Sequence, residues 1–181
     1  VDGLGGAPLG ATVRSGGGRI LFVNGSKLVS VWADGSHRLE TNFPWAYLRD
    51  ATVSRDRKRV AFTVENSGLN LNLYEIWVSP VDMSSPPRLV AAEPGRFVYE
   101  PTWSPDGRRL AYVVGYPSPY GLGYQAHLWV MTADGTHRRL VAATPGAIDQ
   151  PDWSPKGDRV AFVVDGYEVS PMLDVVSVDA R

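Results

Sequence analysis

Short apolar segments recur along the chain, and each of them follows a polar turn. The segments are residues 19–23, 59–64, 108–114 and 159–164. They are five to seven residues long, rich in Val, Ala, Leu and Phe, and preceded by Gly, Pro, Ser or Asp. This length and composition are typical of strands that begin and end at tight turns. The pattern therefore predicts a strand at each position and no helix through any of them.

The apolar segments belong to a repeat with a period of fifty residues. Trp103-Ser104-Pro105-Asp106-Gly107 recurs as Trp153-Ser154-Pro155-Lys156-Gly157. A weaker copy covers residues 53–57, and a degenerate copy ends in residues 19–23. Proline presets φ at the first corner of a reverse turn, and glycine tolerates a positive φ later in it. Each copy thus predicts a turn between a short first strand and the apolar second strand.

A second pattern follows each apolar segment and predicts a third and a fourth strand. Residues 128–135 match residues 31–35, and 76–82 and 173–179 are looser copies. The Ala-Asp-Gly at the end of the clearest copies supplies another tight turn. In the first repeat, Asn24-Gly25 predicts a hairpin turn between the second and third strands. A complete repeat therefore encodes four short antiparallel strands, and the last repeat stops before its fourth.

Repeats of this kind predict an all-β fold, a β-propeller of four-stranded antiparallel blades. We expect about four blades, the last one incomplete, in one propeller domain or fragment that covers residues 1–181. The expected blades are approximately residues 11–42, 43–92, 93–144 and 145–181. A β-sandwich would also contain short strands, but it would not need the fifty-residue recurrence. The chain is expected to be part of a larger propeller, a four-bladed form, or a half that completes itself by self-association.

Composition and charge exclude several classes of function. The net charge of −1 offers no basic excess for contacting nucleic-acid phosphates. The absence of cysteine excludes disulfides and thiolate metal sites. No run of about 18 apolar residues is present, so we expect no membrane span. Residues 1–10 are rich in Gly and lack the basic start and apolar core of a signal peptide.

Residues 101–112 and 128–135 carry a family resemblance. Pro-Thr-Trp-Ser-Pro-Asp-Gly-Arg-Arg-Leu-Ala-Tyr, followed by Leu-Trp-Val-Met-Thr-Ala-Asp-Gly, is similar to the WD40-like PD40 repeat of TolB-type β-propellers. The resemblance extends over about residues 11–179, and the Gly-His and Trp-Asp dipeptides of true WD40 repeats are absent. It departs from the family pattern at Arg55-Asp56-Arg57 and at Lys156. The resemblance implies six blades, an exported bacterial protein in the periplasm or outside the cell, and a protein or peptide partner.

The long connections between strands are the expected recognition surface, because they share one face of a propeller and carry large aromatic residues. They are expected at residues 65–73, 115–126 and 165–171 within blades, and near 42–49 and 93–99 between blades. About half of these aromatic residues are expected to pack between blades instead. The candidate partner-binding residues are Trp45, Tyr47, Arg49, Asp50, Tyr99, Glu100, Tyr116, Tyr120, Tyr124, Asp149 and Gln150.

Three of these candidates occupy one repeat position at the start of the inner strands. Asp50, Glu100 and Gln150 are fifty residues apart and would line the mouth of the central channel. Such a ring could attract a cationic segment of a partner or offer oxygen ligands to Ca²⁺. No calcium-loop spacing accompanies it, so a metal is not predicted. The alternative is that these residues are solvated strand ends without a further role.

No catalytic motif is recognised in the sequence. It lacks a Gly-x-Ser-x-Gly nucleophile elbow, a His-Glu-x-x-His motif and a P-loop. His37 and His137 share a turn position, and Trp103 and Trp153 share a position that would wedge between blades, so both pairs are expected to be structural. We therefore expect no enzymatic activity and no cofactor.

The sequence favours a non-catalytic scaffold that binds a protein or peptide at the long-loop face. The alternative is the gating propeller of a prolyl-oligopeptidase-like serine peptidase, because such enzymes carry similar repeats beside a catalytic domain. A downstream Gly-x-Ser-x-Gly motif in the same reading frame would distinguish the two. A lyase or sugar-binding propeller is the weakest reading, since the chain has only three histidines.

Overall fold

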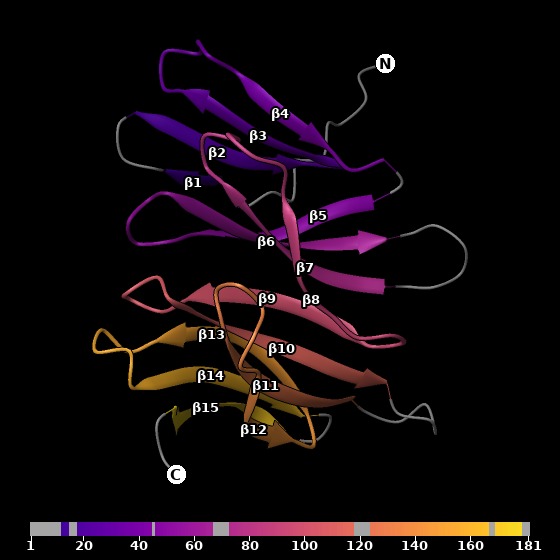
Figure 1. Cartoon of the computed structure of the whole chain (residues 1–181). Coiled ribbons are helices and arrows are strands. Elements are labelled where there is room, and N and C mark those ends of the chain that lie inside the picture. Colours follow the sequence, from indigo (N-terminus) through magenta and orange to yellow (C-terminus); the bar gives the residue numbers. More distant parts are fainter. Residues whose placement is uncertain are drawn as a thin grey trace, which may run out of the picture.

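The computed structural model describes residues 12–14, 18–44, 46–66, 73–117, 124–166 and 169–178. Every regular element in these ranges is a strand, and fifteen strands form four antiparallel sheets. The sheets follow one another in chain order along a stack, from the sheet of residues 12–42 at the top of Figure 1 to the sheet of residues 147–177 in its lower part. The predicted all-β fold is confirmed.

Each sheet is one blade, and its strands lie side by side in chain order. Blade 1 contains β1 (Thr12–Arg14), β2 (Arg19–Asn24), β3 (Lys27–Trp32) and β4 (Leu39–Asn42). Blade 2 contains β5 (Ala46–Val53), β6 (Arg59–Asn66), β7 (Leu73–Pro80) and β8 (Arg88–Ala92). Blade 3 contains β9 (Phe97–Trp103), β10 (Arg109–Pro117), β11 (Tyr124–Thr132) and β12 (Arg139–Thr144). In the described part of blade 4 there are β13 (Ala147–Trp153), β14 (Arg159–Gly166) and β15 (Val169–Ser177).

The four apolar segments predicted from the sequence are the second strands β2, β6, β10 and β14. The first strands of consecutive blades contact one another, β5 with β9 and β9 with β13, so the first strand of each blade is the inner one. The hairpin predicted at Asn24-Gly25 is confirmed, but its turn lies one residue later. Asn24 still pairs with Lys27, and the two central residues are Gly25 and Ser26.

A serine and an aspartate hold the turn between the first and second strands. In blade 3, Ser104 Oγ donates to Asp106 Oδ1 over 2.6 Å and accepts the backbone N–H of Arg109 over 2.9 Å. Blade 2 has the same contacts. In blade 4 a lysine replaces the aspartate, and Ser154 Oγ donates to Asp158 Oδ1 over 2.7 Å instead. The departure from the family pattern at Lys156 is therefore compensated within the same turn.

The other departure, Arg57, leaves a strained backbone that can be tested. Arg57 has φ of 61°, whereas the equivalent Gly107 and Gly157 have φ of 68° and 72°. A side chain in the left-handed region costs about 1–2 kcal/mol, partly offset by the greater flexibility of unfolded glycine. Arg57→Gly is expected to raise the free energy of unfolding in urea by about 0.5–1 kcal/mol. The control is Arg55→Gly, at a position without a positive φ, which should lower the free energy of unfolding. A lower free energy of unfolding in Arg57→Gly would contradict the assigned strain.

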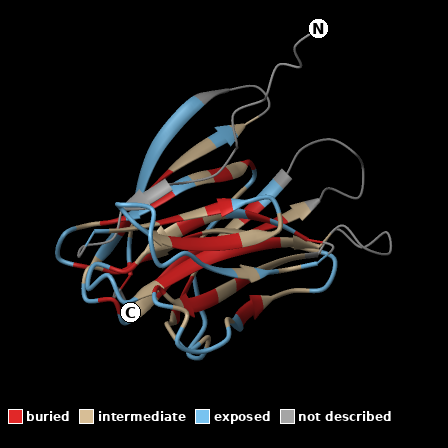
Figure 2. Ribbon diagram, turned by 90° about the horizontal axis from the view of Figure 1, so that it is seen from above, coloured by how far each residue is buried: buried red, intermediate tan, exposed pale blue. Residues whose placement is uncertain are grey.

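The core lies between the blades. One apolar cluster joins Leu21 and Leu28 of blade 1 to Val60 and Phe62 of blade 2. Two further clusters join blade 2 to blade 3 and blade 3 to blade 4 in the same way. In Figure 2 the buried residues accordingly follow the middle of the strands, and exposed residues occupy the turns. Each blade is thus stabilised mainly by its neighbours in the stack.

Candidate binding surface

The structure corrects the expected extent of the long loops. β10 continues to Pro117 and β11 begins at Tyr124, so Tyr116 and Tyr124 are strand residues. Tyr47 and Arg49 lie in β5, and Tyr99 lies in β9. The reason is that antiparallel pairing continues through these ends, each of which contains a tyrosine, a residue that suits strands. Trp45 and Tyr120 lie outside the described residues, as does the side chain of Tyr124.

The repeated tryptophans lie between the blades, where the sequence analysis expects them. Trp153 Nε1 donates to the Thr102 carbonyl oxygen of blade 3 over 3.2 Å, and Trp103 Nε1 donates to Thr52 O of blade 2 over 3.2 Å. Both side chains are 7% exposed. The Arg109 guanidinium lies 4.9 Å from the centre of the Trp153 ring. The indole therefore connects consecutive blades by a hydrogen bond, an apolar contact and a cation–π contact.

The arginine at the start of each second strand adds a contact that sequence reasoning missed. Arg59 donates to the carbonyl oxygen of Gly107 over 2.7 Å, and Arg109 donates to that of Gly157 over 2.6 Å. An arginine at a strand end, considered alone, is normally interpreted as a solvent-exposed residue. The fifty-residue spacing of Arg59, Arg109 and Arg159 is the signal that could have identified it.

The candidate channel residues lie at a bulge that recurs in three inner strands. In blade 3, Tyr99 pairs with Val113 and Thr102 pairs with Ala111, so Glu100 and Pro101 lie opposite the single residue Tyr112. The same two-against-one pairing occurs in blades 2 and 4. The bulged residues have positive φ: 51° for Asp50, 50° for Glu100 and 53° for Gln150. The repeat thus keeps a left-handed, non-glycine residue at each bulge, which proteins rarely do without a compensating contact.

In blades 3 and 4 the compensating contact is a hydrogen bond from the bulge to a carboxylate of the preceding blade. The Gln150 backbone N–H donates to Glu100 Oε2 over 2.6 Å. The Glu100 backbone N–H donates to Asp50 Oδ2 over 3.4 Å, a longer and weaker bond. Asp50, Glu100 and Gln150 therefore form one row across the inner strands, which we call the bulge ladder. The fifty-residue spacing predicted that the three residues occupy equivalent positions, but it gave no sign of the backbone donors.

The pKa values of two carboxyl groups at the bulges, those of Glu100 and Asp149, are raised. The pKa of the Glu100 carboxyl is raised to about 7, mainly by burial and also by the neighbouring carboxylates of Asp50 and Asp149, although the hydrogen bond from the Gln150 N–H lowers it. The pKa of Asp149 is also raised, mainly by burial and then by Asp165. Near neutral pH, Glu100 is therefore close to half protonated.

Glu100→Gln is expected to stabilise the chain at pH 8 but hardly at pH 5. The folded pKa of about 7 exceeds the ordinary value of 4.5, so the folded state binds the proton more tightly. The stabilisation of the folded state by this bound proton is complete below pH 4.5 and is lost as the pH rises through 7. After a discount for partial solvent screening, the variant should gain about 1 kcal/mol over wild type at pH 8 in urea denaturation. A difference in the free energy of unfolding between wild type and Glu100→Gln that does not change with pH would contradict the raised pKa of Glu100.

The remaining candidates do not join the bulge ladder in one cluster. Arg49 forms an ion pair with Glu65 in the adjacent strand, at 2.6 Å. The Tyr99 hydroxyl donates to the Ile148 carbonyl oxygen over 3.3 Å, so this tyrosine packs between blades 3 and 4. Tyr116 packs against His127, and the Arg96 guanidinium lies 4.5 Å from the centre of its ring. These residues have structural contacts that account for them.

Tyr47 differs, because 56% of it is exposed beside a groove. The groove has a volume of about 550 Å³ and lies between the β2–β3 turn of blade 1 and the start of β5 in blade 2. We call it the blade 1–2 groove; its lining residues are Asn24, Gly25, Ser26, Lys27, Arg38, Ala46 and Tyr47. It lies at the end of the blades that carries the second-to-third turns, the face expected for recognition.

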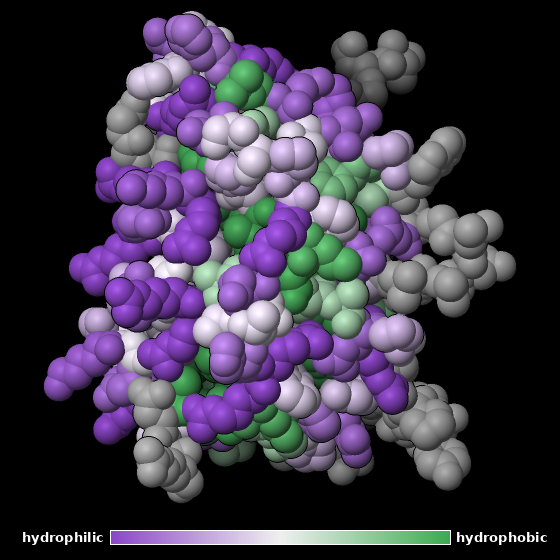
Figure 3. All heavy atoms as spheres, in the orientation of Figure 1, coloured by the Kyte–Doolittle hydropathy of each residue, from purple (hydrophilic) through white to green (hydrophobic). Residues whose placement is uncertain are grey.

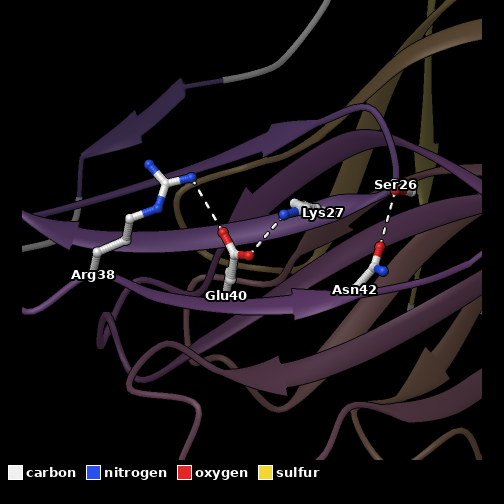
Figure 4. Close-up of polar contacts among 5 residues, drawn as sticks. All are labelled: Ser26, Lys27, Arg38, Glu40 and Asn42. Atoms are coloured by element: carbon white, nitrogen blue, oxygen red, sulfur yellow. Dashed lines mark hydrogen bonds and ion pairs between the residues drawn. The ribbon is translucent and has the colours of Figure 1, made fainter.

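A small charge network lines one wall of the blade 1–2 groove (Figure 4). Lys27 Nζ lies 2.7 Å from Glu40 Oε1, and Arg38 lies 3.2 Å from Glu40 Oε2. These hydrogen bonds hold the pKa of Glu40 below its usual range. Beside them, Ser26 Oγ donates to Asn42 Oδ1 over 3.0 Å. Two cations share one carboxylate, so the wall keeps a net positive charge.

A second groove, of about 510 Å³, lies at the opposite end of blades 2 and 3. Arg59, Arg88 and Arg108 line it together with Asp134. Arg59 and Arg88 already donate to backbone carbonyl oxygens of blade 3. These contacts give two of the three arginines a role in holding the blades together.

Within the described ranges, no group of three His, Cys, Asp or Glu side chains could hold a metal ion. The described residues also contain no candidate for a membrane-spanning helix. Figure 3 shows that hydrophilic residues dominate the left flank of the stack and that apolar residues surface near its middle and lower end.

The stacked sheets, with adjacent inner strands and cores between them, define a partial β-propeller of four blades. No protein-family model and no curated protein sequence matches the chain. Solved structures of β-propeller proteins do match. A Mycobacterium tuberculosis puromycin-hydrolyzing peptidase is 17% identical with a TM-score of 0.74, over 97% of this chain and 30% of the peptidase.

Two further solved structures of other proteins also match the chain. TolB from Acinetobacter baumannii is 14% identical with a TM-score of 0.63, over 90% of this chain and 39% of TolB. An oligogalacturonate lyase from Vibrio parahaemolyticus is 15% identical with a TM-score of 0.66, over 89% of this chain and 46% of the lyase. The chain thus spans less than half the length of each of these proteins. At this level of identity, the similarity defines the fold alone.

Proposed function

We propose that this chain is a non-catalytic β-propeller scaffold that binds an extended segment of a protein partner in the blade 1–2 groove. The observation that carries the proposal is the exposed Tyr47 ring beside an open, cationic groove. Tyrosine and arginine are enriched in the centre of protein interfaces, because they combine large contact areas with hydrogen bonding. The volume of the groove lies within the range of known ligand sites.

The backbone around the groove favours a preformed site. The Leu48 N–H donates to the Gly25 carbonyl oxygen, and the Phe43 N–H donates to that of Ser26, both over 2.8 Å. These bonds hold the β2–β3 turn against blade 2, so binding would not require this wall to become ordered. A preformed groove reduces the entropic cost of association.

The charges favour a partner segment that carries an acidic side chain. Among the described residues, Lys27 and Arg38 form their ion pairs with the same carboxylate, Glu40, and a carboxylate of the partner would complete the network. The alternative, a cationic segment at the bulge ladder, is less favoured. The carboxylates of Asp50 and Glu100 already accept backbone N–H groups of the next blade. Similarity to TolB supports a periplasmic or extracellular location for such a scaffold.

A peptide selected from a random display library against the purified chain would test the proposal. Labelled and titrated by fluorescence anisotropy, it should bind Tyr47→Ala at least about tenfold more weakly. Lys27→Gln should weaken binding severalfold and reduce its dependence on salt. The matched control is Arg55→Ala, an exposed residue in the turn at the other end of blade 2. Full affinity in Tyr47→Ala, or a loss only in Arg55→Ala, would contradict the proposed surface.

A second candidate function is the gating propeller of a serine peptidase. It is favoured by the match to the puromycin-hydrolyzing peptidase, which covers nearly all of this chain but under a third of that enzyme. In this case the polypeptide that contains the chain would also carry a Gly-x-Ser-x-Gly elbow. A fluorophosphonate probe would label that polypeptide, but it would not label residues 1–181 alone.

A further inference from the structure

The turns at one end of blades 2 to 4 carry far more positive charge than the net charge of −1 for the whole chain suggests. The turns between first and second strands and those between third and fourth strands share this end, because consecutive strands are antiparallel. We call it the turn end. Eleven Lys and Arg but five Asp residues occur in these turns and the residues that border them, at 53–59, 80–88, 103–109, 132–139 and 153–159.

The opposite end of the same blades has no such excess. By the same count, its described connections carry one arginine and one carboxylate, Arg96 and Glu93. Arg138 pairs with Glu93 over 3.6 Å, and without it the cations of the turn end still exceed the aspartates by five. The first-to-second turns lie at the left of Figure 1, on the flank where hydrophilic residues dominate in Figure 3.

The aspartates of the turn end are explained by the turns that they shape. Asp106 accepts from Ser104 Oγ over 2.6 Å, and Asp134 accepts from Thr136 Oγ1 over 2.7 Å. The other three aspartates accept comparable hydrogen bonds inside their own turns. These bonds hold the pKa of all five carboxyls below the usual range. The geometry of the turns does not account for the larger number of cations.

Two equivalent grooves at the turn end bring arginine side chains together. One is the groove of about 510 Å³ between blades 2 and 3, and the other, of about 430 Å³, lies between blades 3 and 4. Both are lined by a cross-strand pair of valine and arginine, Val78 with Arg88 and Val130 with Arg139. The arginine that begins a second strand also lines each groove. The repeat therefore presents the same set of guanidinium groups twice, in consecutive blades.

The lining of these grooves fits carboxylate side chains on an extended polypeptide. A guanidinium group has five N–H donors in a planar fork that matches a carboxylate, and the backbone contacts of Arg59 and Arg88 use only part of them. Val78, Pro80 and Pro86 add apolar surface for the aliphatic parts of such a segment. The described lining residues include no Phe, Tyr or Trp on which a base or a sugar ring could stack. The chemistry therefore favours an acidic protein segment over a nucleic acid or a polysaccharide.

We propose that the turn end of blades 2 to 4 binds an extended acidic segment of a protein partner. Its Asp or Glu side chains would pair with arginines of both grooves, among them Arg108, whose side chain is exposed. This surface lies at the opposite end of the blades from the blade 1–2 groove. The chain thus presents two separate binding surfaces, and the inference does not rest on the proposed function.

A fluorescein-labelled peptide of six Glu-Ala repeats, titrated with the chain by fluorescence anisotropy, tests the proposal. It should bind with an affinity that falls as salt is added, whereas the matched peptide of six Gln-Ala repeats should not bind. Arg108→Gln should weaken binding about fivefold or more. Arg108→Lys should weaken it at least about twofold, because lysine keeps the charge but not the planar fork.

Two control variants separate the grooves from other surfaces. Arg55→Gln removes the same charge from an exposed residue of the turn end that lines neither groove, and it should change the affinity less than about twofold. Tyr47→Ala alters the blade 1–2 groove at the other end and should leave the affinity unchanged.

Four outcomes would overturn the proposal. Equal weakening by Arg108→Gln and Arg55→Gln would show that diffuse charge, and not the grooves, attracts the peptide. A loss of binding in Tyr47→Ala would place the acidic segment in the blade 1–2 groove. Binding of the chain to phosphatidylglycerol vesicles but not to the peptide would make an anionic lipid surface the partner. A dimer in light scattering that Arg108→Gln dissociates would make a second copy of the chain the occupant.

Discussion

Replacing Trp103 or Trp153 by alanine is expected to lower the free energy of unfolding by about 3–5 kcal/mol, the usual cost of removing a large buried aromatic side chain. Each ring fills the contact between two blades, and its loss also removes an indole hydrogen bond and an arginine contact. Urea denaturation of the two single variants would measure the effect.

The matched control for this prediction is Trp103→Phe. Phenylalanine keeps an aromatic ring beside Arg59 but cannot donate to the Thr52 carbonyl oxygen. Trp103→Phe should therefore lower the free energy of unfolding by about 1–2 kcal/mol, clearly less than Trp103→Ala. Losses below about 1 kcal/mol for both alanine variants would mean that the rings are exposed and free for another role.

Gly135→Ala is expected to lower the free energy of unfolding by about 2–4 kcal/mol, the sum of backbone strain and overpacking. Gly135 has φ of +85°, and a Cβ atom there would lie 2.6 Å from the Val90 carbonyl oxygen of blade 2. The backbone of blade 2 cannot move away easily, because Arg88 donates to the Asp134 carbonyl oxygen over 2.8 Å.

Gly35→Ala separates the two causes. Gly35 occupies the equivalent turn of blade 1 with φ of +84°, but a Cβ atom there would have no neighbour within 4 Å. Gly35→Ala should therefore lower the free energy of unfolding only by the backbone strain, about 1–2 kcal/mol. Equal losses in the two variants would show that blades 2 and 3 are not in close contact at this turn.

The sequence predicted the elements that depend on local pattern. The second strands were placed within a few residues, because apolar runs that follow polar, turn-forming segments leave few alternatives. The interblade position of Trp103 and Trp153 followed from their recurrence. The ends of the strands were misplaced, because segments such as Gly115-Tyr116-Pro117 read as turns when only their composition is considered.

The bulges and the groove depend on contacts between distant residues, so pattern alone could not supply them. Pro101 and Pro151 were a usable signal, since proline cannot donate to a strand ladder and therefore marks a bulge or an edge. No comparable signal identifies the blade 1–2 groove. Its walls come from the β2–β3 turn, Arg38 and Tyr47, which only the docking of two blades brings together. Tyr47 was nevertheless among the predicted binding residues.

Hydrogen exchange of the tryptophan indole groups, followed by NMR, tests most directly whether the fifty-residue repeats stack as blades. We expect slow exchange for Trp103 Nε1–H and Trp153 Nε1–H, because both are buried and donate to the preceding blade. Trp32, which is more exposed at the end of β3, should exchange much faster. Equal, fast exchange at all three positions in the folded chain would contradict the stacked-blade architecture.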